Sequence, residues 1–302
     1  MENTAFQKKI QEFLPGISFR FAEPMKNHTS FRIGGPAQVM AFPKNAEELS
    51  EILKASKLLD LNIRILGAGT NILAPDEGIS GLVICLKDSI DGMELLPNNR
   101  IRVAAGVSMA RAAMFAAGKG LSGLEFAHGI PGSVGGGVYM NAGAYGGEIC
   151  QVCESVDVMD MDGNIHTYTS EEMGFSYRHS RLEDEGGIVL SAVFALMPKP
   201  ENEIREKMQE LIAKRRASQP LDKPSAGSAF KRPVGGYAAA LIDGAGLKGY
   251  RVGDAAVSEK HAGFVVNVGD ATAADVQELL RQVSDKIFEN SGIRIEPEVR
   301  IW

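Results

Sequence analysis

The sequence has few cysteines and no hydrophobic run that approaches the roughly 20 residues a membrane helix needs. Residues 1–16 mix Glu, Lys and Gln and contain no signal-peptide core. The net charge is −6 and there is no basic tail, so polyanion binding is disfavoured and nothing resembles a nucleic-acid module. These absences predict a cytoplasmic protein without membrane or nucleic-acid partners. The sequence leaves the oligomeric state open, and a monomer is the expectation.

The cysteines are three in number. Cys150 and Cys153 are spaced as C-x-x-C, whereas Cys85 lies far away in the sequence. No second pair of this kind and no His pair completes a zinc set, so we expect no metal site. A redox pair remains an alternative, but buried apolar thiols are favoured.

The length of the chain predicts several domains, and its glycine content indicates glycine-rich loops. A chain of 302 residues should form two or three domains. It contains 34 Gly, above the usual share of about 7 %, and they gather in particular loops. The sequence divides into three blocks, residues 1–87, 88–200 and 201–295, followed by residues 296–302.

The first block predicts a small α/β unit. Asn45 is a candidate helix N-cap with Glu48 three residues later, as in a capping box, and apolar residues then recur at helical spacing. Strands are predicted at Asn62–Leu66 and Leu82–Leu86. Because helix and strand alternate here, we expect these two strands to form a parallel pair.

The second block combines a hairpin with a long glycine-rich stretch, Gly123–Gly147. Val156–Met161 and Ile165–Thr169 alternate on either side of Asp162–Gly163, which is a strong hairpin signal. The other predicted elements are a strand at Ile101–Ala105, a helix at Met109–Ala117 and a strand at Ile188–Leu196.

The third block predicts two amphipathic helices and an extended end, Ile293–Trp302. One face of the first helix carries Ile204, Met208, Leu211 and Ile212. One face of the second helix, Ala274–Glu289, carries Val276, Leu279, Leu280, Val283 and Ile287.

Two glycine-rich loops indicate a ligand that approaches the backbone. Gly67–Asn71 follows a strand, and glycines there allow close approach of a phosphate. It is neither the G-x-G-x-x-G fingerprint, because Ile72 replaces the third glycine, nor a P-loop, so a simple tight turn stays open. Gly129–Gly147 is longer, and so many glycines raise the cost of ordering the chain. Together the loops suit an extended, diphosphate-bearing cofactor.

Six segments together resemble one enzyme family, the UDP-N-acetylenolpyruvoylglucosamine reductases. They are Asn27–Gly35, Gly67–Asn71, Gly129–Gly147, Tyr177–Ser180, Ala226–Phe230 and Glu296–Arg300, in the family's order. The resemblance implies non-covalent FAD, NADPH as reductant and an enolpyruvyl sugar nucleotide as substrate, in bacterial cell-wall precursor synthesis. Only short turns separate the strands after Cys153, so the chain resembles the shorter class, which lacks a tyrosine-bearing loop over the substrate.

The resemblance also implies the fold. It is an α+β chain of three domains, in which residues 1–87 and 88–200 form a vanillyl-alcohol-oxidase-like FAD-binding unit. Residues 201–295 form a C-terminal α/β substrate-binding domain, and the strand 296–302 returns to the active site. The implied cofactor-binding residues are Arg32, Gly67, Ala68, Gly69, Thr70, Asn71, Gly129, Pro131, Gly132, Ser133, Gly135, Gly136, Asn141, Gly143 and Ala144.

Three residues match the family's catalytic positions. Arg178 would face the substrate carboxylate, because its planar fork stays charged, although by itself it would be read as a surface charge. Ser228 would donate a proton, although a turn or cap serine beside Gly is the alternative. Glu298 would share the developing charge, chosen over Glu296 by the family register alone.

The substrate is expected to bind through Tyr177, Lys231, Arg232 and His261. Residues 214–260 contain nine Lys or Arg and four Asp or Glu, an excess of five positive charges in an acidic chain, which fits a diphosphate-binding region. A solvated face and a structural His261 are the alternatives. Two other functions stay open: an oxidase or dehydrogenase of the same flavin fold, and a non-catalytic flavin sensor.

Overall fold

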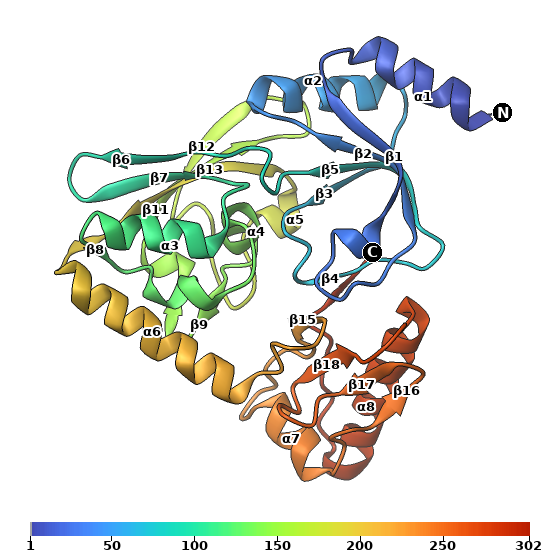
Figure 1. Ribbon diagram of the computed structural model, residues 1–302, viewed down its shortest axis with the longest axis vertical. Helices are drawn as coiled ribbons and strands as arrows, with labels where there is room; N and C mark the ends of the chain where they lie inside the picture. The colour runs from blue at the N-terminus through green and yellow to red at the C-terminus, as the bar shows by residue number, and fades with distance from the viewer. Residues whose placement is uncertain (1) are drawn as a thin grey trace. The chain divides into compact units, whose positions relative to one another are not determined.

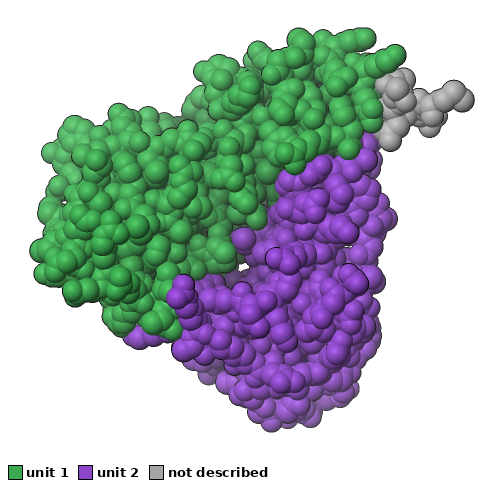
Figure 2. Space-filling model, viewed as in Figure 1, with its two compact units in different colours: residues 1–21, 39–68, 81–213 green, residues 22–38, 69–80, 214–302 purple. Residues whose placement is uncertain are grey.

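The computed structural model describes residues 2–302, which form two compact units built from interleaved stretches of chain. Unit 1 contains residues 1–21, 39–68 and 81–213, and unit 2 contains residues 22–38, 69–80 and 214–302 (Figure 2). The chain therefore passes between the units five times, and four of these crossings lie inside the predicted first block, residues 1–87. Among residues 2–302, no helix is both long and apolar enough to cross a membrane.

Two larger sheets lie mainly in unit 1 (Figure 1). The four-stranded sheet has the order β1-β2-β5-β3 and the five-stranded sheet the order β12-β11-β13-β7-β6. The strands of the first sheet are β1 (Ser18–Pro24), β2 (Pro36–Phe42), β3 (Ile63–Leu66) and β5 (Ile79–Cys85). Those of the second are β6 (Met93–Leu96), β7 (Arg100–Ala104), β11 (Cys153–Met159), β12 (Ile165–Thr169) and β13 (Ile188–Ala195).

Helices and short elements complete unit 1. The helices are α1 (Glu2–Phe13), α2 (Ala46–Leu58), α3 (Met109–Gly118), α4 (Val134–Tyr139), α5 (Leu182–Glu185) and α6 (Glu201–Ser218), with 3-10 turns η2 (Glu125–Gly129) and η3 (Ile149–Gln151). Short strands pair as β8 (Leu121–Ser122) with β14 (Met197–Pro198), and β9 (Gly143–Ala144) with β10 (Gly147–Glu148).

The expected elements of the first block are confirmed. Asn45 Oδ1 accepts the Glu48 N–H at 2.8 Å, which caps α2. The Glu48 carboxylate accepts the N–H of Lys44 at 2.8 Å rather than that of Asn45, so the expected capping box is shifted by one residue. Strands β3 and β5 pair in parallel, with Ile63 opposite Leu82.

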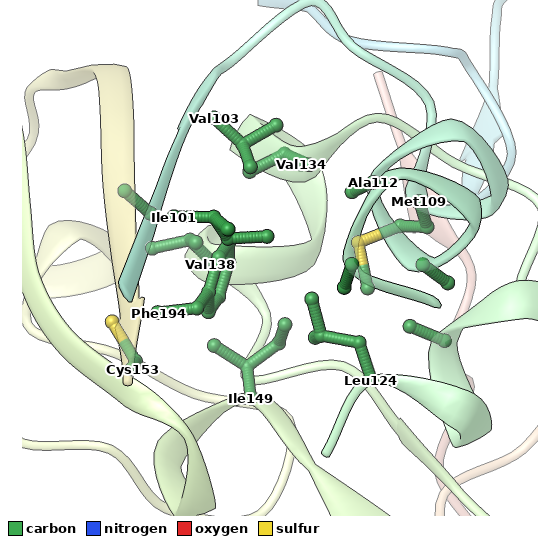
Figure 3. Close-up of a cluster of buried hydrophobic side chains, with 14 of the residues drawn as sticks. Ile101, Val103, Met109, Ala112, Leu124, Val134, Val138, Ile149, Cys153 and Phe194 are labelled. Atoms are coloured by element: carbon green, nitrogen blue, oxygen red, sulfur yellow. The ribbon is translucent and has the colours of Figure 1, made fainter. Parts of the chain in front are cut away.

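The elements of the second block are also confirmed, with one addition. β11 and β12 form the antiparallel hairpin, and Gly163 in its turn has φ 87°, which glycine adopts without strain. The glycine-rich stretch, expected as a loop, contains α4 with Ser133 as its N-cap. Its apolar residues decide this, because Val134 and Val138 are completely buried beside Ile101 and Phe194 (Figure 3).

Unit 2 is a four-stranded antiparallel sheet with two helices. The sheet has the order β15-β18-β17-β16, α8 packs against β16 and β17, and α7 packs against α8. Its elements are η1 (Met25–Asn27), β4 (Ile72–Leu73), β15 (Ser225–Ser228), α7 (Ala238–Gly244), β16 (Arg251–Val252), β17 (Ala255–Val257), β18 (Phe264–Asn267), α8 (Ala273–Ser291) and β19 (Arg300–Ile301). The predicted apolar stripe of α8 is fully buried, which confirms that helix.

The core of unit 2 depends on residues far away in the sequence. Phe31, Ile33 and Leu73 are buried among residues of the C-terminal region. In unit 1, Ile204 and Met208 of α6 pack into the core of the five-stranded sheet. The three-domain division stays a prediction, since these compact units are a coarser description.

Candidate functional site

Within unit 1, Gly67 at the start of the first glycine-rich loop lies close to the second loop. A Cβ atom on Gly67 would lie 2.6 Å from Ser133 Oγ and 3.9 Å from the Gly136 backbone. Gly136 itself is exposed, and a Cβ there would meet only Ser133 Oγ, at 3.5 Å. Gly136 therefore leaves open space beside the first loop, which suits a ligand that approaches the backbone.

Most neighbouring glycines are needed for internal packing. A Cβ on Gly135 would lie 2.9 Å from Ala105 Cβ, and one on Gly137 would lie 2.9 Å from Met109 Sδ. Gly143 and Gly147 would clash with Glu148 and Phe126, respectively. Glycine numbers alone are therefore weaker evidence for a ligand than the sequence argument assumed.

Arg178 lies in a strained turn of unit 1. Ser176 and His179 pair across the turn, and Arg178 has φ 57°, a conformation that non-glycine residues rarely adopt. Its guanidinium lies 5.3 Å from the centre of the Tyr177 ring and donates to Gly143 O at 3.4 Å. Strain of this kind persists where the surrounding structure holds it, and it clusters at functional sites.

Two buried side chains hold this turn, and sequence reasoning missed that role for both. Asn141 Nδ2 donates to Ser176 O at 3.0 Å and to the Glu148 carboxylate at 3.1 Å, while its Oδ1 accepts the Cys150 N–H at 3.0 Å. Ser180 Oγ donates to Tyr139 O at 2.8 Å. The structure thus assigns Asn141 a supporting role behind Arg178, and its expected contact with the cofactor stays a prediction.

Ser228 and Glu298 lie on neighbouring segments of unit 2. Ser228 ends β15, opposite Phe264 of β18. The next residue, Ala229, accepts the Glu298 N–H at 2.8 Å, and Phe230 forms a bridge with Pro297. The structure therefore pairs the backbone segments that carry two of the three predicted catalytic residues, whereas the third, Arg178, belongs to unit 1.

The two candidate glutamates differ in their surroundings. The Glu296 side chain is 72 % exposed and pairs with Lys231, with 3.4 Å between Oε2 and Nζ. Glu298 is half-buried, and its carbonyl accepts from Asn71 Nδ2 at 3.1 Å. An exposed carboxylate with a lysine partner is the ordinary surface case, and the choice of Glu298 over Glu296 stays a prediction of the family resemblance.

The predicted substrate-binding residues of unit 2 lie close to Ser228 along the chain (Lys231, Arg232) or precede its strand partner Phe264 (His261). Arg232 lies over the Tyr237 ring at 4.5 Å. His261 packs edge-on against Phe264 at 5.0 Å, and its Nδ1 accepts the Gly263 N–H at 3.1 Å. Burial lowers the pKa of His261 below its ordinary value of 6.5, so its imidazole is disposed to be neutral.

Arg32 lines an open cavity of about 870 Å³ in unit 2. Lys26, Lys223 and the loop 267–272 before α8 share this lining. Asp76 also lies there, and its two carboxylate oxygens accept the N–H groups of Ala273 and Ala274 at 2.7 and 3.1 Å. Arg32 thus lines a cavity of mixed charge, because Asp222 and Asp270 belong to the lining as well, and its expected contact with the cofactor stays a prediction.

Comparison with known proteins identifies the family. Residues 219–302 match the C-terminal domain profile of UDP-N-acetylenolpyruvoylglucosamine reductase, and residues 37–169 match an FAD binding domain. UDP-N-acetylenolpyruvoylglucosamine reductase of Agathobacter rectalis is 48 % identical, covering 99 % of this chain and 98 % of the relative. That of Streptococcus pneumoniae strain Hungary19A-6 is 44 % identical, with 98 % and 97 % covered. The chain belongs to the UDP-N-acetylenolpyruvoylglucosamine reductase family.

A solved structure of the family agrees with this membership. The crystal structure of UDP-N-acetylenolpyruvylglucosamine reductase from Thermus caldophilus matches with a TM-score of 0.80 and 40 % identity, covering 95 % of this chain and 98 % of that one. The family resemblance and the flavin cofactor are confirmed. The match to the FAD binding domain contains Gly67 and Gly136, and the C-terminal match contains Ser228 and Glu298.

The residues of this UDP-N-acetylenolpyruvoylglucosamine reductase family member fit a flavin cofactor. The evidence for this fit is at Gly136, where the missing Cβ leaves open space that internal packing does not require. Gly69 is different, because a Cβ there would lie 1.9 Å from His28 O, so its glycine is already needed by the protein.

The three cysteines form no disulfide bond. Cys85 and Cys153 are buried, as expected, and Cys150 is half-buried. Burial raises the pKa of Cys153 to about 12 and also raises the pKa of Cys85 and Cys150. Thiols with raised pKa values are poor nucleophiles, which agrees with the preferred structural interpretation.

Proposed function

We propose that this chain reduces UDP-N-acetylenolpyruvoylglucosamine to UDP-N-acetylmuramate with NADPH, through non-covalently bound FAD, in the cytoplasm. The observation that carries the proposal is the pairing of the Ser228 and Glu298 segments, with 2.8 Å between Glu298 N and Ala229 O. This backbone bond puts the segments that carry the Ser228 hydroxyl and the Glu298 carboxylate next to each other, and these two groups would suit proton transfer at a carbon beside a carboxylate. The family membership supplies the substrate class.

The chemistry requires positive charge and a proton. When bound, the flavin supplies a hydride to the terminal carbon of the enolpyruvyl group. The guanidinium of Arg178 would stabilise the charge that develops on the substrate carboxylate. Ser228 would give its proton to the neighbouring carbon, and Glu298 would share the carboxylate charge through a proton or a water.

The remaining residues would bind and orient. We propose that Gly67 and Gly136 let the backbone approach the cofactor, and that Lys231 and Arg232 contact the diphosphate of the sugar nucleotide. Tyr177 and His261 would line the sugar. We further propose the vanillyl-alcohol-oxidase-like arrangement of three domains and the shorter class of the family. NADPH and substrate would use one site in turn, which gives ping-pong kinetics.

Anaerobic stopped-flow spectroscopy tests this function. NADPH should bleach the protein-bound flavin before any substrate is present, and the enolpyruvyl sugar nucleotide should then restore its colour. Ser228→Ala should leave the bleaching step unchanged and slow the recolouring step about 10²- to 10⁴-fold. Ser225→Ala, on the same strand, is the matched control and should change neither step. A flavin that NADPH cannot reduce without substrate would contradict the proposal.

A further inference from the structure

The peptide groups on both sides of Glu298 are fixed by hydrogen bonds. Its N–H donates to Ala229 O at 2.8 Å, and its carbonyl accepts from Asn71 Nδ2 at 3.1 Å. The first bond comes from the segment that follows Ser228, and the second comes from the first glycine-rich loop. Glu298 is therefore held between the strand of the proton donor and the loop proposed to approach the cofactor.

Asn71 uses two different groups to hold the C-terminal strand. Its backbone carbonyl accepts the Arg300 N–H at 3.0 Å, which begins the parallel pairing of β19 with β4. The regular ladder pairs Arg300 with Ile72 and Ile301 with Leu73, and therefore begins beyond Glu298. The Asn71 side chain adds a hydrogen bond to Glu298 itself, which lies outside this ladder.

The two residues before Glu298 form different contacts from those of Glu298 with Asn71. Pro297 has no N–H to donate, and the Glu296 carbonyl accepts the Lys231 N–H at 2.9 Å on the other side. Strand ends fray unless they are held, and a misplacement of about 1 Å at a reacting group can cost roughly 100-fold in rate. The Asn71 amide is thus placed where a small movement of the carboxylate would matter.

We propose that Asn71 is a positioning residue for Glu298 in the step that consumes the enolpyruvyl substrate. This inference rests on the function proposed above and adds a role to Asn71, which the sequence associates only with the cofactor. Asn71 acts on the carboxylate through the backbone of its residue and does not touch the reacting atoms. The loop that carries it thereby links the placement of the flavin to the placement of Glu298.

The test compares two side chains that hold the same strand. Asn71→Ala and Asn71→Asp remove the donor to Glu298 O, whereas Ser284→Ala removes the 2.8 Å bond from Ser284 Oγ to Ile295 O, three residues earlier. With saturating enolpyruvyl substrate, both Asn71 variants should recolour about 10- to 100-fold more slowly, and NADPH bleaching of the flavin that they hold should slow far less. Ser284→Ala should keep both rates.

A double variant separates positioning from general loosening. With Glu298→Gln already present, Asn71→Ala should slow the recolouring step no further, because the two changes act on one group. The inference would be overturned if the losses in recolouring rate were additive, or if the Asn71 variants slowed both half-reactions equally. It would also be overturned if Ser284→Ala had the same effect as the Asn71 variants, or if both Asn71 variants lost bound flavin. If the unaltered protein fails to recolour with the substrate, the proposed function fails instead.

Discussion

Adjacent glycines of α4 are glycine for opposite reasons. Gly135 faces the end of β7, where no Cβ fits, and Gly136 faces open space. A sequence pattern shows only that both lack side chains. The physical consequence is that substitutions one residue apart should separate folding from cofactor binding.

Gly136→Val and Gly135→Val make this comparison. Gly136→Val should keep or raise the free energy of unfolding of the flavin-free protein by a few tenths of a kcal/mol, because Val is a better helix residue than Gly. It should lose FAD, since the new side chain would occupy the space proposed for the cofactor. Gly135→Val should destabilise the protein by about 1–3 kcal/mol through overpacking against Ala105. Urea unfolding and the visible flavin spectrum measure the two effects, and a yellow, stable Gly136→Val protein would contradict the argument.

His261 predicts a pH dependence of stability. Because burial lowers its pKa in the folded protein below 6.5, the unfolded chain binds a proton first as the pH falls. The free energy of unfolding should therefore decrease as the pH falls through 6.5 toward the lower folded pKa, and this contribution should level off below it. His261→Gln removes the titrating group and should flatten this part of the profile. Urea titrations from neutral to mildly acid pH test it, and an unchanged acid loss in His261→Gln would show that other groups cause it.

Elements with one clear pattern were predictable from the sequence. The stripe on α8, the β11–β12 hairpin and the parallel β3–β5 pair all follow from periodicity and turn residues that act locally. The helix α4 was not, because three glycines argue against helix and only the burial of Val134 and Val138 outweighs them. Tertiary packing decides such cases, and a single sequence does not contain it.

The candidate site was predictable as a set of residues but not as a set of contacts. The family resemblance selected Ser228 and Glu298, and the structure places their segments side by side. The supporting roles of Asn141 and Asn71 depend on partners 35 and 227 residues away in sequence. No local spacing encodes these partners, so only a fold could find them.

The first turn of α8 offers a test at the level of an element. Both oxygens of Asp76 accept N–H groups from this turn, and the Thr272 side chain accepts the Asp275 N–H. Removing a carboxylate from a helix N-terminus loses both hydrogen bonds and the favourable dipole interaction. Asp76→Ala should lower the free energy of unfolding by about 1–2 kcal/mol, whereas Glu77→Ala, at an equally exposed neighbouring position, should change little. Urea unfolding of both variants measures the two free energies of unfolding. If both variants lose the same amount, Asp76 does not specifically stabilise the first turn of α8.

The whole molecule interleaves its chain, which limits what can fold alone. Unit 2 takes Phe31, Ile33 and Leu73 into its core, and strand β4 pairs with the C-terminal β19. Residues 214–302 by themselves would lose these contributions and the Asp76 contacts to α8.

A fragment of residues 214–302 should therefore not fold cooperatively, although most of it matches a recognised domain. Three large core side chains would leave cavities and an uncovered apolar surface, and each missing side chain costs about 2–5 kcal/mol, comparable to the whole stability of a small domain. Circular dichroism should show no cooperative thermal transition, and amide signals should be poorly dispersed. Because the missing parts are residues 22–38 and 69–80, adding a polypeptide of residues 22–80 should restore the transition if packing is the reason. If the fragment melts cooperatively without the added polypeptide, residues 214–302 form a complete core by themselves and the N-terminal segments are not required for it.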